Sequence, residues 1–139
     1  MSIFPIFETA NSALHTNRVW MDAVADNIAN INTIRPYDQP AFEARFIVAT
    51  ARRADNGDPP GVGGGSDPSA VLFGDPKGRT RYDPGNPLAN KDGLVRYPDI
   101  DLGDQMTSLL MAQRSYQLNL AVVDRARDAY LQALNINGR

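Results

Sequence analysis

Two heptad-like apolar patterns, one near each end of the chain, constrain the fold most strongly. In the N-terminal pattern, apolar residues recur at alternating steps of three and four, and polar Asn17 fills the one missing place. The apolar members are Phe7, Ala10, Leu14, Met21, Val24, Ile28 and Ile31. This spacing predicts one apolar face on a helix of about 25 residues. Because Pro36 disfavours helical geometry at Arg35, we expect the N-terminal helical segment to occupy residues 1–34.

The C-terminal pattern predicts a second helical segment over residues 99–139. Acidic residues cluster at its start, where negative charge complements the helix dipole: Asp99, Asp101 and Asp104. The apolar positions again recur at steps of three and four, with polar Gln113 and Arg127 interrupting the stripe. They are Met106, Leu109, Leu110, Tyr116, Leu120, Val123, Tyr130 and Leu134. The fold class that follows is mainly α, with the two terminal helices packing as a coiled-coil-like pair.

Residues 35–98, between the helices, form a loop-rich middle segment with short strands. The chain has 11 Gly and 10 Pro, and most of them lie here. β-branched and apolar content predicts strands near Phe42–Ala51, Val71–Phe73 and Leu94–Tyr97. Residues 56–69 read NGDPPGVGGGSDPS and are too rich in Gly and Pro for regular structure. We expect that stretch to be a flexible, exposed loop.

Charge and composition exclude several functional classes. The net charge of −2 argues against nucleic-acid binding, which needs clustered Lys and Arg. With no cysteine and a single histidine, His15, a metal centre or a catalytic triad is not expected. A cluster of acidic residues at a helix start is explained by the dipole. We therefore predict no cofactor and no enzyme activity.

Targeting signals are also absent from the pattern of the chain. Residues 1–8 lack the positive charge and the long apolar stretch of a secretory signal peptide. No apolar run approaches the roughly 18 residues that a membrane span needs. We expect no membrane insertion, and any export to use a route without a cleaved signal.

Two narrow apolar faces, separated by a loop-rich region, make a thin core and favour association with other helices. Periodicity alone leaves the partner open, because it does not say which copy of the chain supplies the facing helix. A self-contained helical hairpin, a coiled-coil dimer, and an adaptor that pairs with one partner protein all fit the pattern.

The segment Asp26–Thr33, which reads DNIANINT, resembles the flagellar axial-protein family. Rod and hook members of that family carry a similar Asn-x-Ala-Asn-x-x-Thr segment at the end of their N-terminal helix. The stretch Tyr82–Val123 is similar to the basal-body rod proteins, in particular those of the proximal rod. It contains YDP, GLVRYP and, within the helix, RSYQ. One departure follows Thr33, where Ile34-Arg35-Pro36-Tyr37 replaces the usual x-Gly-Tyr.

The resemblance implies a structural subunit of the bacterial flagellar basal-body rod. Its terminal helices are expected to stack with those of other copies and other rod subunits in a helical tube that transmits motor torque to the hook. Export through the flagellar type III apparatus to the periplasmic rod is also implied. The expected assembly interface comprises Phe7, Leu14, Met21, Val24, Asn27, Ile28, Asn30, Met106, Leu109, Tyr116, Leu120, Val123 and Leu134. Asn27 and Asn30 share a helix face, where they are either solvated or hydrogen-bonded across a helix interface to fix subunit register.

Overall fold

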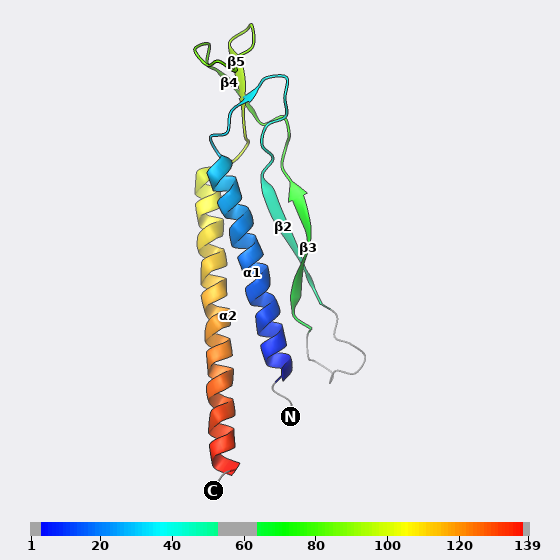
Figure 1. Cartoon of the computed structure of the whole chain (residues 1–139), viewed down its shortest axis with the longest axis vertical. Coiled ribbons are helices and arrows are strands. Elements are labelled where there is room, and N and C mark those ends of the chain that lie inside the picture. Colours follow the sequence, from blue (N-terminus) through cyan, green and yellow to red (C-terminus); the bar gives the residue numbers. More distant parts are fainter. Residues whose placement is uncertain (1–3, 53–63, 138–139) are drawn as a thin grey trace.

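Two long helices run side by side in antiparallel directions and set the elongated shape of the chain (Figure 1). This is a computed structural model that describes residues 4–52 and 64–137. Helix α1 spans Phe4–Asn30 and helix α2 spans Leu102–Asn137. These helices confirm the sequence prediction of a helical segment near each terminus. Because α2 has 36 residues and α1 has 27, α2 is longer by about 14 Å at 1.5 Å per residue.

The ends of both helices follow from short-range chemistry. Pro5 lies in the first turn of α1, where its missing N–H leaves no bond unmade. At the other end of α1, the Asn30 side chain donates to the carbonyl of Asp26 and accepts from the hydroxyl of Thr33. Helix α2 begins after Asp101, whose carboxylate accepts a 3.1 Å hydrogen bond from the backbone N–H of Asp104. Asp101 is therefore the N-cap of α2.

A long β-hairpin lies along α1 on the side away from α2 (Figure 1). Strand β2, Arg45–Ala51, pairs antiparallel with strand β3, Ser66–Phe73, and the register shifts between Val48 and Ala49. The prediction of a flexible loop over residues 56–69 is therefore wrong for Ser66–Ser69, which begin β3. Pairing with a distant strand overrides the local turn signal there. Residues 56–63 lie outside the described residues.

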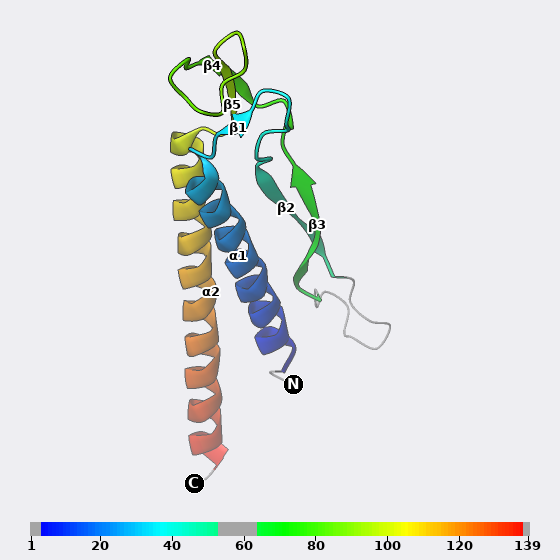
Figure 2. The same ribbon diagram turned by 45° about the horizontal axis from the view of Figure 1, so that its top comes forward.

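A three-stranded sheet sits at the end of the molecule where α1 stops and α2 starts (Figure 2). Strand β5, Leu94–Tyr97, lies between β1, Arg35–Pro36, and β4, Arg79–Tyr82. The prediction of a strand at Leu94–Tyr97 is confirmed. Arg35-Pro36, where the sequence departs from the family pattern, forms β1 at the sheet edge, which is a position where proline is tolerated.

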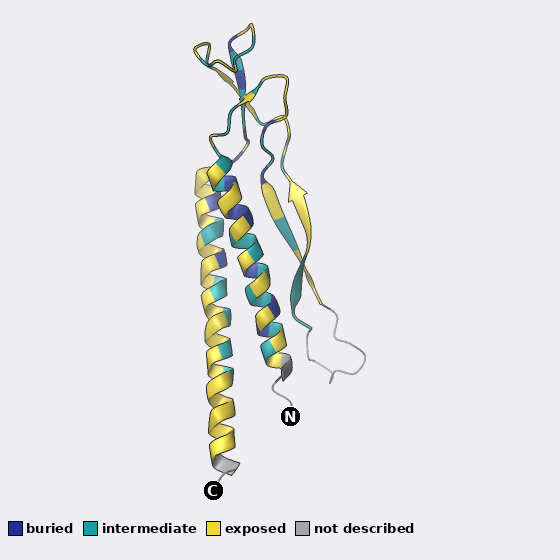
Figure 3. Cartoon of the chain, viewed as in Figure 1, coloured by how far each residue is buried: buried dark blue, intermediate teal, exposed yellow. Residues whose placement is uncertain are grey.

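The buried residues of the described chain are small. Besides Val95, which is fully buried, the apolar core consists mainly of alanines and valines: Ala10, Ala23, Val24, Ala41, Ala44, Ile100 and Ala112. Figure 3 shows the buried residues as separate patches along α1, in the first turns of α2 and at the sheet end of the molecule, while most of α2 is exposed. The narrow core expected from the sequence is thus present, and α1 is the element at its centre.

Candidate assembly surface

Asn27 is the most buried polar residue of the described chain, with none of its surface exposed. Its side-chain oxygen accepts a 2.8 Å bond from the Arg45 N–H, and its Nδ2 donates to the Arg45 carbonyl at 3.0 Å. Nδ2 also donates to Oε1 of Gln105 on α2 at 2.9 Å. The Asn27 amide therefore binds the edge of β2 as another strand's peptide group would, and it ties β2 and α2 to α1.

Of the two alternatives for Asn27, the solvated position is wrong, because the side chain is buried. Its hydrogen bonds cross a helix interface, but that interface lies between α1 and α2 of one chain. Asn30, three residues later, is half-buried and makes local bonds that close the end of α1. Both residues thus act within the subunit in this structure, and any contact they make with a second subunit stays a prediction.

The opposite end of the hairpin is held on α1 by hydroxyl groups. The Ser66 N–H donates to Ser12 Oγ at 3.1 Å, and Thr16 Oγ1 donates to the Ser66 carbonyl at 3.0 Å. Gly65 precedes Ser66 with φ of 91°, and a Cβ there would collide with the Ser12 side chain. Small and hydroxyl side chains on this face of α1 therefore let the hairpin approach the helix backbone closely.

An exposed ion-pair cluster lies at the same end of the β2–β3 hairpin. Arg52 donates to both carboxylate oxygens of Asp67, at 2.8 and 2.6 Å, and to Glu8 at 3.1 Å. The hydrogen bonds from Arg52 lower the pKa of Asp67, and Asp67 in turn raises the pKa of Arg52. The cluster connects both strands to the first turns of α1, but its exposure to water limits what it adds to stability.

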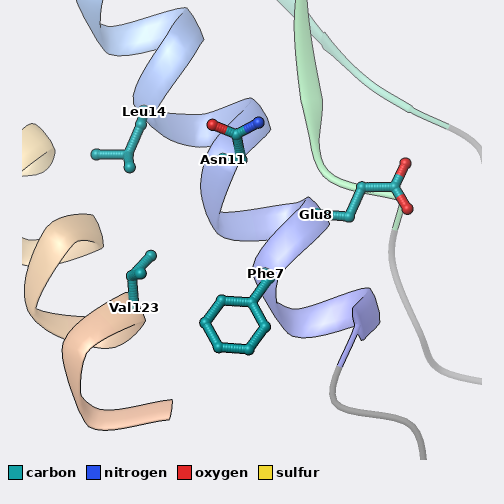
Figure 4. A pocket seen from close by; sticks show the side chains of 5 residues that line it. All are labelled: Phe7, Glu8, Asn11, Leu14 and Val123. Atoms are coloured by element: carbon teal, nitrogen blue, oxygen red, sulfur yellow. The ribbon is translucent and has the colours of Figure 1, made fainter. Parts of the chain in front are cut away.

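The predicted apolar residues of α1 face inward. Val24 is buried, and the other apolar members of the predicted interface on this helix are half-buried: Phe7, Leu14, Met21 and Ile28. Figure 4 shows Phe7 and Leu14 pointing toward Val123 of α2. With Glu8 and Asn11, these side chains line an open notch between the helices. The α1 stripe is therefore largely covered within one chain.

Helix α2 differs from α1 because its apolar side chains are mostly uncovered. Leu109, Tyr116 and Val123 are half-buried, whereas Met106, Leu120 and Leu134 are exposed. The predicted interface omitted further apolar residues of α2 that are exposed: Leu102, Leu110, Met111, Leu118, Val122, Tyr130 and Leu131. We call these ten exposed residues of α2 the α2 surface. Several of them fall outside a single stripe. An apolar content of α2 greater than one stripe needs was the sequence signal that could have identified them.

The α2 surface also extends beyond α1. Figure 1 shows the C-terminal turns of α2 projecting past the first turn of α1. Tyr130 and Leu134 continue the face on which Val123 lies, at steps of seven and four residues, yet both are exposed. The face that packs on α1 therefore continues into a stretch with no partner among the described residues. Exposed apolar patches of this extent mark interaction sites in soluble proteins.

Other kinds of site find no support in the described residues. No group of three or more His, Asp or Glu side chains in residues 4–52 and 64–137 is arranged to hold a metal ion. Neither described helix has an apolar stretch long and uncharged enough to cross a bilayer. The α2 surface is thus the main candidate for a functional site.

Comparison with known proteins matches both ends of the chain to flagellar families. Residues 7–36 match the family described as flagella basal body rod protein, and residues 91–136 match the C-terminal family of flagellar basal body rod FlgEFG proteins. The flagellar basal-body rod protein FlgC of Yersinia enterocolitica is 31% identical, with 98% of each chain covered. The FlgC of Salmonella typhimurium is 29% identical, again with 98% of each chain covered. The FlgC of Bacillus subtilis is 28% identical, covering 98% of this chain and 99% of its own.

Proposed function

Because this chain belongs to the flagellar basal-body rod protein family, we propose that the α2 surface is the face through which it polymerises into the rod. The chain is a structural subunit of that rod. Residues 1–34 and 99–139 are then polymerisation segments, and residues 35–98 form an appended middle segment. The observation that carries the proposal is the contrast between the covered apolar stripe of α1 and the exposed apolar residues of α2.

The contacts between subunits are heterologous, since only head-to-tail surfaces propagate into a helical tube. The α2 surface of one subunit packs against helices of its neighbours, and the predicted interface residues of α1 contribute by holding α2 in place. Helices α1 and α2 pack as a coiled coil in the assembled rod, where helices of neighbouring subunits cover α2 on several sides. A tube closed in this way would carry motor torque to the hook.

The small core also fits the expected route of assembly. A subunit whose buried apolar residues are mainly Ala and Val loses little burial free energy when it unfolds. Such a chain can pass through the flagellar type III export apparatus in an unfolded or partly folded form and fold again in the periplasmic rod. The export apparatus and other rod subunits are therefore its proposed partners.

A pair of exposed charge substitutions tests the polymerisation surface. Leu110 and Met111 are 54% and 57% exposed, so Leu110→Asp and Met111→Asp leave the monomer core intact. In cells lacking the native copy, each variant is expected to abolish or strongly reduce rods in isolated basal bodies. Lys91→Asp, at an exposed turn position outside the α2 surface, is the control and should support normal rods.

The alternative function, an adaptor, predicts a different assembly from a rod subunit. An adaptor that pairs with one partner would form a discrete complex whose size does not grow with concentration. Normal motility in both the Leu110→Asp and Met111→Asp strains would overturn the assignment of α2 as the polymerisation surface.

A further inference from the structure

The outer edge of β3 carries backbone groups with no strand partner among the described residues. The Gly74 N–H donates to the Ala44 carbonyl at 2.8 Å, and bonded pairs alternate along an antiparallel ladder. Phe46 and Leu72 therefore form the next bonded pair. Phe73 and Arg45 are opposite each other and form a non-bonded pair. Arg45 directs its N–H and C=O away from β3, toward Asn27. Phe73 must likewise direct its N–H and C=O away from β2.

The same alternation turns the N–H and C=O of Val71 outward. Within residues 4–52 and 64–137, no strand lies beyond β3 in its sheet. Val71 and Phe73 therefore form a free strand edge of the kind that pairs with another chain.

This edge lacks the features with which proteins normally protect a strand edge. The first half of β3 has them, because Pro68 removes a donor and Asp67 adds charge. The second half has neither, and its side chains are apolar and exposed: Val71 by 44%, Leu72 by 58% and Phe73 by 61%. An open apolar edge of this kind is a template for strand addition.

In the described part of the chain, a second free edge matches the first. Strand β4 lies at the end of the order β1-β5-β4. The Asp83 N–H donates to the Gly93 carbonyl at 2.8 Å, so the alternation turns Thr80 and Tyr82 outward. Tyr82 is 69% exposed. Each edge therefore offers two outward-facing residues at the same spacing.

The two edges also differ in charge. Segment 66–75, which contains β3, carries Asp75 and Asp67, the latter paired with Arg52, and no basic residue. Strand β4 carries Arg81 and Arg79, the latter paired with Asp99, and no acidic residue. Two β4 edges would bring arginines of both copies together, which is unfavourable. A β3 edge against a β4 edge has opposite signs, and both edges are present on every copy.

We propose that the β3 edge of one copy pairs antiparallel with the β4 edge of a second copy, with Val71 opposite Tyr82 and Phe73 opposite Thr80. In this register all outward N–H and C=O groups of the four residues meet a partner. An aromatic residue faces a β-branched one in both pairs, which favours cross-strand packing. The contact is heterologous and propagates, so it rests on the proposed polymer and adds a lateral contact to the one made by α2.

Disulfide trapping tests this register, because the chain has no cysteine of its own. A copy with Val71→Cys and a copy with Tyr82→Cys are expressed together in cells lacking the native copy. Basal bodies are isolated and oxidised, and crosslinked dimers are measured on a non-reducing gel. Phe73→Cys with Thr80→Cys forms the second test pair.

Both test pairs should give roughly tenfold more crosslinked dimer than Val71→Cys with Arg81→Cys, whose side chains lie on opposite faces of the paired strands. Equal yields from test and control pairs would overturn the register. Crosslinking of Val71→Cys copies to each other would overturn the choice of β4, because it reports pairing of two β3 edges.

Hydrogen exchange of the native chain gives an independent measurement. The amides of Val71 and Phe73 should exchange rapidly in the purified monomer and become protected in isolated rods. Rods that form with these amides unprotected would refute the edge contact while leaving the rod function intact. Basal bodies that lack this chain altogether would instead refute the proposed function.

Discussion

Removing the Asn27 side chain should destabilise the monomer far more than removing the Asn30 side chain three residues later. Asn27→Ala deletes the bonds to the Arg45 N–H, the Arg45 carbonyl and Gln105 Oε1. Each such bond contributes about 0.5–1.5 kcal/mol, and a buried group left without a partner costs about 1–3 kcal/mol. Gln105 is buried, so water does not readily replace its lost partner. The expected loss is roughly 3–5 kcal/mol.

Asn30→Ala is the matched control, because its bonds to Asp26 and Thr33 are local and partly exposed. Its expected cost is about 1 kcal/mol or less. The free energy of unfolding is measured by urea titration followed by circular dichroism, under conditions where the chain is monomeric. Exchange of the Arg45 amide gives a local measurement, which should accelerate in Asn27→Ala and stay unchanged in Asn30→Ala.

Asn27→Asp makes the same test sharper. The carboxylate still accepts from the Arg45 N–H, but it faces two acceptor oxygens to which it cannot donate. A buried charge of this kind is costly, so Asp should destabilise at neutral pH at least as much as Ala. Protonation at acid pH restores one donor and should recover part of the loss. Equal stability of Asn27→Ala and Asn30→Ala would refute the role of Asn27 as the tie between α1, β2 and α2.

Three further outcomes follow from the packing and the charges. Val24→Asp should unfold the helix pair and block incorporation into rods, because Val24 is 3% exposed and the new charge has no partner; normal motility would contradict this. The lowered pKa of Asp67 means that its bond to Arg52 contributes fully above the ordinary value of 3.8 and is lost as the pH falls through the lower folded-state pKa. Amide protection at the Arg52 end of the hairpin should therefore fall in acid, and Asp67→Asn should remove that pH dependence. Truncation after Ala126 should leave monomer stability within about 1 kcal/mol, since residues 127–135 are exposed, yet prevent rod formation; assembly of the truncated chain in isolated basal bodies would count against a role for the projecting turns.

Much of the fold could be predicted because it depends on the spacing and type of residues that are neighbours in sequence. Periodicity placed both helices, and the short segment Leu94–Tyr97, which reads LVRY, was predicted as a strand with the bounds that β5 has. The start of β3 was missed because Ser66–Ser69 has loop composition and becomes a strand only through pairing with β2. Strand β4 was missed for a similar reason, since it is defined by its register with β5.

The candidate site was predicted less completely than the fold. The stripe pattern identified which residues are apolar, but not which of them would be covered. On α1 the predicted residues turn inward, while on α2 the uncovered set includes Met111, Leu118 and Val122, which no single stripe contains. The second face of α1 gave no apolar signal at all, because small and hydroxyl side chains such as Ser12 and Thr16 receive the hairpin there.

The sequence by itself determined two terminal helices with apolar stripes, a loop-rich middle and a thin core, because these depend on spacing and composition along neighbouring residues. Only the tertiary structure decided that Asn27 is an internal tie and that α2 is the uncovered face. The Asn27 bonds span 18 and 78 positions of sequence, and no local pattern specifies which distant group meets a given side chain. Burial is likewise a property of the assembled elements, so one apolar stripe is covered and the other is left for a neighbour.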